Sequence, residues 1–195
     1  MPQIVFPFRT SMLASVVLLA SATLLPAAPP TSQPASQVTP KMYTNSTYHF
    51  GMEFPSNWKV KDEHAGARFY HLELLPPPTV TAEGRGDPRV EILVKPEVDP
   101  RVRNWKEANE RNNAEVKKAN PQNSVTAADH PVAGAIGYEF LVKAVQEDGS
   151  MLCHWHVSFE KVPYTYLIDI WSDSENYDAI KSAVDKGLAG FKFVQ

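Results

Sequence analysis

His154 and His156 stand one residue apart, and this spacing is the clearest chemical signal in the chain. Residues i and i+2 of a β-strand leave the same face, so both imidazoles are expected on one side of a sheet. Asp169 lies on the next predicted strand, where the pairing places it opposite either His154 or His156. Two imidazoles and one carboxylate provide three ligands suited to Zn²⁺ or Cu²⁺. His154, His156 and Asp169 are therefore the candidate metal ligands.

The same residues have a second interpretation, as a polar sheet face without a metal. In it the histidines hydrogen-bond to Asp169, Thr165 or Glu139, partly beneath a helix. The expected register also places Lys143 opposite His154, and this positive charge disfavours a bound cation. We expect the hydrogen-bonded face, with metal binding as the alternative.

Catalytic arrangements are not indicated. Cys153 directly precedes His154, but neighbours on a strand point to opposite faces, and Cys153 shares the apolar face with Met151 and Trp155. A thiol in such surroundings stays protonated and inert. The sequence contains no nucleophile elbow, phosphate-binding loop, dinucleotide fingerprint or His-Glu-x-x-His motif. We therefore predict a non-enzymatic protein with no catalytic residue and no cofactor.

The histidines belong to a predicted β-hairpin with its turn at Asp148-Gly149. This dipeptide favours a two-residue type I′ turn. A two-residue turn places Cys153 opposite Ala144, Trp155 opposite Val142 and Val157 opposite Phe140, so that apolar residues meet at every step. A second turn, at 161–163, leads into the strand that carries Asp169, and two registers remain open there.

The other predicted elements give an α+β domain, an antiparallel sheet with helices. Alternating apolar residues indicate strands, whereas Asp99-Pro100 and a thin apolar stripe indicate a surface-lying helix. The expected loop up to Pro88 is long and predicted to be mobile. The expected strands are 48–54, 68–75, 90–94, 138–144, 151–159 and 164–171, with helices at 99–119 and 175–188.

Residues 1–22 have the parts of an export signal. Arg9 precedes a mostly apolar stretch at 12–20, and Ala20-Ser21-Ala22 supplies a cleavage pattern. The apolar stretch is shorter than the roughly 20 residues of a membrane-spanning helix. The protein is therefore expected to be exported, to the periplasm or the extracellular space. An uncleaved segment would instead anchor it to a membrane.

Composition divides the rest of the chain and excludes several partners. Residues 23–42, rich in Pro, Ala and Ser, are expected to form a linker to a folded domain at 43–195. Of 19 basic and 22 acidic residues only Arg9 lies in the first 40, so the domain is mildly acidic, which argues against nucleic acid or anionic lipid as the main partner. The single Cys153 excludes an internal disulfide and a multi-cysteine metal site.

The segment Tyr48-His49-Phe50-Gly51-Met52-Glu53-Phe54-Pro55-Ser56-Asn57-Trp58 resembles the opening of the PsbP-like superfamily. Gly137-Tyr138-Glu139-Phe140, the strand at 164–170 and the ending Gly190-Phe191-Lys192-Phe193 are also similar. The likeness spans roughly residues 43–194 and includes exported bacterial members. It implies an antiparallel sheet with helices on both sides, and a family that mostly binds other proteins, some plant members also binding metal ions through histidines.

These observations give two functional hypotheses. The first is an exported, non-enzymatic accessory or binding protein that engages a protein partner in the cell envelope. Trp105 and the 79–88 loop are its candidate contact surfaces. The second is a metal-binding protein that uses His154, His156 and Asp169.

Overall fold

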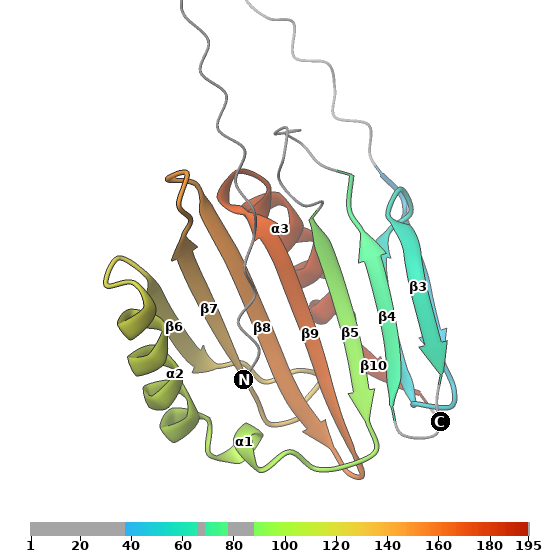
Figure 1. Ribbon diagram of the computed structural model, residues 1–195. Helices are drawn as coiled ribbons and strands as arrows, with labels where there is room; N and C mark the ends of the chain where they lie inside the picture. The colour runs from blue at the N-terminus through green and yellow to red at the C-terminus, as the bar shows by residue number, and fades with distance from the viewer. Residues whose placement is uncertain (1–37, 66–68, 78–87, 195) are drawn as a thin grey trace, which may run out of the picture. The chain divides into compact units, whose positions relative to one another are not determined.

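The computed structural model describes residues 38–65, 69–77 and 88–194 (Figure 1). The expected export signal at 1–22, the linker up to residue 37 and all of the 79–88 loop except Pro88 lie outside the described residues. None of the helices in the described ranges is both long and apolar enough to cross a membrane.

The described residues form two antiparallel sheets and three helices, which confirms the predicted α+β class. The larger sheet has seven strands in the order β3-β4-β5-β9-β8-β7-β6, and the smaller has three in the order β1-β2-β10. The strands are β1 (Pro40–Asn45), β2 (Phe50–Pro55), β3 (Lys59–Ala65), β4 (Tyr70–Leu75), β5 (Arg89–Lys95), β6 (Ser124–Asp129), β7 (Gly137–Val145), β8 (Met151–Lys161), β9 (Tyr164–Asp173) and β10 (Lys192–Phe193). The helices are α1 (Pro100–Arg103), α2 (Trp105–Ala119) and α3 (Ser174–Ala189).

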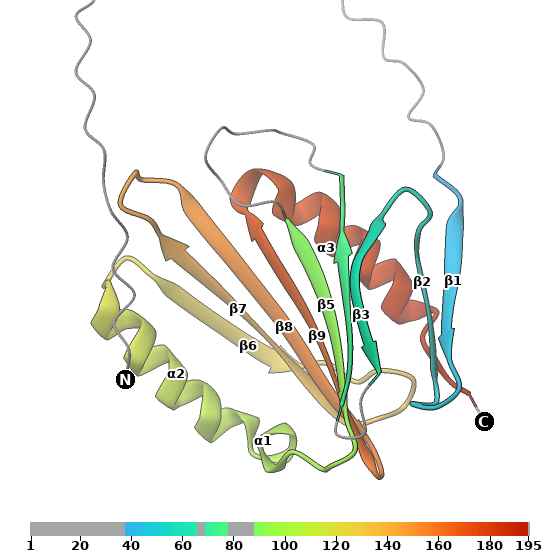
Figure 2. The ribbon, with the colours of Figure 1, turned by 45° about the vertical axis from the view of Figure 1, so that its right-hand side comes forward.

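One face of the seven-stranded sheet forms the hydrophobic core. Helix α3 and the three-stranded sheet both pack against it, as Figure 2 shows. Phe50 of β2 lies against Tyr166 of β9, with ring centroids 6.1 Å apart. Further along, α3 contributes Ile180 and Val184, both buried. Alternation along the strands follows from this one-sided burial, because every second side chain faces the core.

The opposite face of the seven-stranded sheet is turned toward the viewer in Figure 1. Helix α1 contacts β7 and β8, and α2 contacts β6 and β7. Over β4, β5 and β9 no helix of the described residues lies on this side. We call the part of this face that spans β4, β5, β9 and β8 the open face.

The predicted helix at 99–119 is two helices separated at Asn104. The Asp99 carboxylate accepts a hydrogen bond from the Arg101 main-chain N–H at 2.9 Å and caps the short α1. Asn104 then leaves the helical conformation, and α2 starts at Trp105. As its thin stripe predicts, α2 buries no side chain.

The predicted strands do not include β1, β3, β6 or β10, and the separation into two sheets was not predicted. β1 begins at Pro40, so residues 40–42 of the expected linker lie within a strand. β1 and β6 are short and mostly exposed, and neither has the alternation of large apolar residues that marked the predicted strands.

The predicted β7–β8 register is wrong by one residue. Cys153 lies opposite Lys143, Trp155 opposite Leu141 and Val157 opposite Glu139. The hairpin closes with a hydrogen bond of 2.8 Å from the Gln146 N–H to the Ser150 carbonyl, which leaves a three-residue loop. Gly149 occupies its last position with φ +80°, as in a type I turn followed by a bulge.

This register changes which β7 side chains accompany the histidines. Tyr138, Phe140 and Val142 lie opposite Ser158, His156 and His154, on the face away from α3. On the α3 side, Glu139 takes a place among core residues, where its carboxylate accepts a hydrogen bond from the Trp155 indole at 2.8 Å. That bond compensates for the partial burial of the carboxylate.

Candidate functional site

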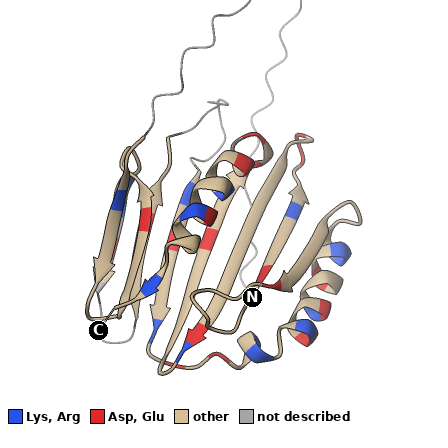
Figure 3. Ribbon diagram, turned by 180° about the vertical axis from the view of Figure 1, so that it is seen from behind, with Lys and Arg blue, Asp and Glu red and all other residues tan. Residues whose placement is uncertain are grey.

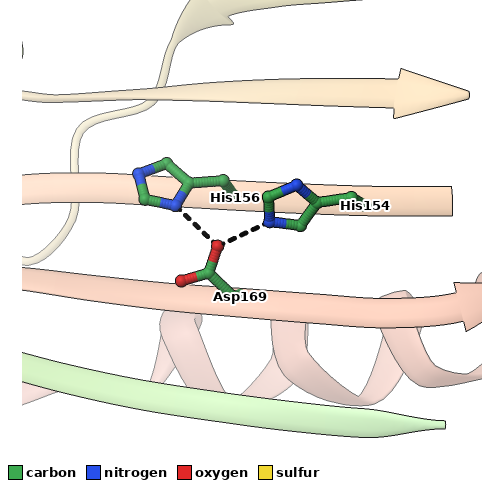
Figure 4. A group of neighbouring side chains, drawn as sticks. All are labelled: His154, His156 and Asp169. Atoms are coloured by element: carbon green, nitrogen blue, oxygen red, sulfur yellow. Dashed lines mark hydrogen bonds and ion pairs between the residues drawn. The ribbon is translucent and has the colours of Figure 1, made fainter. Parts of the chain in front are cut away.

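His154, His156 and Asp169 come together in the structure, as the spacing predicts (Figure 4). His154 Nε2 and His156 Nδ1 each lie 2.8 Å from Asp169 Oδ1. The three possible ligand atoms are all within 4.8 Å of one another. Both imidazoles thus meet one oxygen of a single carboxylate, which is the hydrogen-bonded arrangement expected for a polar sheet face.

Two strands and two aromatic rings position this cluster. The pairing of β8 with β9 places His156 directly opposite Asp169, which settles the register that the sequence left open. The His154 ring stacks on Trp171, with centroids 3.7 Å apart and an interplanar angle of 8°. On the other side, His156 stacks on Phe140 at 4.8 Å. The aromatic walls restrict rotation of both imidazoles and leave the carboxylate as their shared partner.

Asp169 is ionised in this environment. Burial alone would raise the pKa of its carboxyl, because only 18% of the side chain is exposed to solvent. The hydrogen bonds from His154 and His156, together with their charges, outweigh burial and lower the pKa to about 2. A carboxylate with two imidazole partners is therefore present throughout the physiological pH range.

Lys143 does not lie opposite His154. It faces Cys153 on the other side of β8, and Val142 takes the place opposite His154. The positive charge that the sequence appeared to place beside the histidines is therefore absent from this position. Arg89 packs on the aromatic wall, with its guanidinium carbon 5.1 Å from the centre of the Trp171 ring.

A row of carboxylates crosses the open face beside the cluster and was not foreseen. Glu73, Glu91 and Asp169 lie directly opposite one another on β4, β5 and β9. Like charges in register destabilise a sheet, so each needs a compensating group. Lys61 lies 2.9 Å from Glu73, and Arg89 lies 2.7 Å from Glu91. Period two places each of these carboxylates on the polar face of its own strand, but only the strand order brings the three together.

The remaining ionisable candidates lie elsewhere. His71 shares a face with Glu73, as expected, and β5 separates both from β9. His71 Nε2 lies 3.9 Å from Glu91 Oε2. Cys153 is buried among apolar side chains, and this burial raises the pKa of its thiol. The thiol leaves β8 on the opposite face from the histidines.

Comparison with solved structures identifies the architecture. The solution structure of cyanobacterial PsbP (CyanoP) from Synechocystis sp. PCC 6803 superposes with a TM-score of 0.54 at 12% identity, covering 84% of this chain and 99% of that one. The Ran-binding protein Mog1p of Saccharomyces cerevisiae gives a TM-score of 0.51 at 11% identity, covering 82% and 97%. The chain has the PsbP/Mog1 fold. No family model and no curated protein matches the sequence.

The PsbP/Mog1 fold confirms the architecture that the resemblance implied. Identities of 11–12% establish the fold alone and assign no partner or ligand. Function in this PsbP/Mog1-fold domain must therefore be argued from its own side chains, and the open face gathers most of those with distinctive chemistry.

Proposed function

We propose that this chain is an exported, non-enzymatic binding protein that engages a protein partner in the cell envelope through its open face. The observation that carries the proposal is the composition of that face. Trp171 is partly exposed there, beside the carboxylates of Glu73, Glu91 and Asp169, and Phe140 of the neighbouring β7 is also partly exposed. Exposed aromatic residues are frequent anchors of protein interfaces.

The expected occupant is a folded protein surface that presents Lys or Arg side chains. Three carboxylates stand in a row across the face, and the cations Lys61, Arg89 and Lys95 lie around them. A Lys or Arg side chain of the partner would complement the row of carboxylates at short range. The description of Mog1p as a Ran-binding protein supports protein binding as a use of the fold.

Site-specific photocrosslinking in cells of the source organism tests this proposal. A benzophenone amino acid at Trp171 should give a discrete adduct with an envelope protein, identified by mass spectrometry. Glu91→Lys should abolish that adduct, because it reverses a charge in the centre of the row. The matched control places the crosslinker at the exposed Ser182 of α3, on the other side of the sheet. Equal adducts from both positions, or none from Trp171, would contradict the proposal.

The export part of the proposal rests on residues 1–22 and has its own test. We expect the mature protein in the periplasmic or extracellular fraction, with an N-terminus beyond residue 22. N-terminal sequencing of the protein from its source cells measures both properties. A cytoplasmic protein that retains Arg9 would refute export without affecting the fold.

Metal binding remains a second candidate, favoured by one specific observation. His154, His156 and Asp169 place three possible ligand atoms within 4.8 Å, a spacing that a single ion can bridge. The imidazoles now donate to Asp169, so Zn²⁺ or Cu²⁺ would have to displace those protons. Metal binding would accordingly weaken as the pH falls.

Thermal unfolding with and without Zn²⁺ or Cu²⁺ decides this candidate. An ion at 100 times its dissociation constant adds about 2.7 kcal/mol to the free energy of unfolding, a clear rise in melting temperature. The rise should disappear in His154→Ala and persist in the control His71→Ala, because His71 lies beyond β5. No rise in the wild-type protein would exclude a metal at this cluster.

A further inference from the structure

The outer strand β6 presents free main-chain groups. Within the described residues β6 pairs only with β7, so it forms one edge of the seven-stranded sheet. The His130 N–H donates to the Gly137 carbonyl at 2.9 Å, which fixes the alternation of antiparallel hydrogen bonds. The N–H groups of Val125, Ala127 and Asp129 consequently point away from β7. None of the three has a hydrogen-bond acceptor in the part of the chain that the structure describes.

The two edges of this sheet differ in how they are protected. β3, at the opposite edge, carries Lys59 and Lys61, and its pairing is interrupted by a bulge between Val60 and Asp62. Charged residues and bulges are the usual devices that prevent an edge from pairing with another chain. β6 has the sequence SVTAAD, with no lysine, proline or bulge, and only its last residue is charged. β6 itself therefore carries none of these sequence devices, and α2, which runs beside it, contacts it with Trp105 packed on the face away from α3.

A pocket of about 170 Å³ adjoins this edge on the α3 side of the sheet. Thr126, Ala127 and Ala128 line it from β6, and Glu139, Trp155 and Lys181 line it from the other elements. Ala127 lies opposite Phe140, whose ring stacks on His156, so the Ala127 side chain points to the other face. The main chain of Ala127 therefore lines the pocket, which places the pocket directly against the edge strand.

The pocket contains an incompletely used carboxylate. Glu139 Oε2 receives three contacts: the Trp155 indole at 2.8 Å, His130 Nδ1 at 3.2 Å and Lys181 Nζ at 3.9 Å. Glu139 Oε1 has no partner among the described residues, although the side chain is only 28% exposed. Lys181 also pairs with Asp185, so two carboxylates share one ammonium group. This local excess of negative charge suits an additional cation.

Helix α2 lies against β6 from the opposite face. Trp105 of α2 stacks on Tyr138 with centroids 6.2 Å apart, and the Tyr138 ring lies 6.0 Å from His156. The pocket lies on the α3 side of the sheet. Figure 3 views the domain from this side, with α3 crossing in front of the sheet. An approach to the pocket therefore does not require contact with the histidine face.

We propose that β6 accepts an extended segment of a partner protein as an added strand, with a Lys or Arg side chain in the pocket against Glu139 Oε1. Main-chain hydrogen bonds to Val125, Ala127 and Asp129 would supply the affinity. The pocket would select the basic side chain, as in other cases of strand addition. This surface is separate from the open face, so the inference goes beyond the proposed function and can fail or succeed independently of it.

Selection from a random twelve-residue peptide library displayed on phage tests the inference without a known partner. We expect enriched peptides that share one Lys or Arg within a stretch of strand-forming residues. Ala127→Pro should weaken their binding at least tenfold, because it removes an outward N–H and leaves the hydrogen bonds to β7 intact. Lys59→Pro, at the start of the other edge, is the matched control and should leave binding unchanged.

Glu139→Gln tests the pocket, and hydrogen exchange provides a readout that needs no variant. Glu139→Gln should reduce affinity for the basic peptides at least fivefold and leave lysine-free peptides unaffected. In wild-type protein, a bound peptide should slow amide exchange at Val125, Ala127 and Asp129. No enriched peptide, full binding to folded Ala127→Pro, or unchanged exchange at these amides would each overturn the inference.

Discussion

At the scale of single residues, Asp169 has the most strongly determined environment on the open face. One of its oxygens accepts from both His154 and His156, and these bonds hold the pKa of the carboxyl at about 2. Because the folded pKa lies below the unfolded value near 3.8, ionised Asp169 stabilises the fold above pH 4. This stabilisation is lost as the pH falls toward 2.

Asp169→Asn should therefore destabilise the protein at pH 7 by about 2 kcal/mol, the free-energy equivalent of the pKa shift. The difference from wild type should shrink as the pH falls below 4. Urea unfolding of both proteins at pH 7 and pH 2.5 measures it. Asp178→Asn, on the exposed side of α3, is the control and should change little at either pH. A pH-independent loss would show that the variant acts through packing and not through charge.

The candidate cluster could be predicted from the sequence because it depends on short-range rules. His154 and His156 share a face in any register, since two residues is the period of a strand. To place Asp169 beside these histidines, the sequence needed only to indicate the short turn between β8 and β9. The carboxylate row of Glu73, Glu91 and Asp169 could not be predicted, because β5 and β9 pair although α1, α2 and three strands intervene in the chain.

At the scale of elements, one loop residue decided the β7–β8 register. Asp148-Gly149 suits a two-residue turn, but it equally suits a three-residue loop that ends on a glycine with positive φ. The structure has the second form, with Gly149 at φ +80°. The apolar pattern could not distinguish the two registers, because Leu141 and Val142 are both apolar. Leu141 packs against the core, whereas Val142 lies opposite His154 on the other face.

The N-terminal ends of α3 and α2 differ in how much their capping residue contributes to stability. The Asp173 carboxylate caps α3 by accepting from the main-chain N–H groups of Glu175 at 3.0 Å and Asn176 at 2.8 Å. Asp173→Ala should lower the free energy of unfolding by about 1 kcal/mol, the usual cost of losing such a cap. Asn104→Ala is the matched control, because Asn104 precedes α2 without any side-chain cap bond. Equal losses in urea unfolding would contradict this difference.

At the scale of the whole domain, Gly187 allows α3 to approach the three-stranded sheet. A Cβ at this position would lie 2.4 Å from the Glu53 carbonyl oxygen and 2.8 Å from Met52 Cε. The Glu53 main chain is held in β2, between β1 and β10, and can yield little. The close packing of α3 on β2 therefore depends on the absence of a side chain at residue 187.

Gly187→Ala should destabilise the domain by about 1–3 kcal/mol, the usual cost of overpacking a core. Gly190→Ala is the matched control, since a Cβ there would meet no atom closer than 3.7 Å. Thermal unfolding of the two variants measures the difference. A Gly187→Ala protein as stable as Gly190→Ala would mean that α3 does not pack this closely in solution.

The central claim for the whole molecule is that a basic protein partner binds the open face. The most direct measurement is the affinity of the partner identified by crosslinking for two charge-reversed variants, Glu91→Lys on the open face and Asp178→Lys on α3. We predict at least a tenfold loss of affinity for Glu91→Lys and wild-type affinity for Asp178→Lys. Wild-type affinity in Glu91→Lys, or a loss confined to Asp178→Lys, would contradict the account and move the partner to the other side of the sheet.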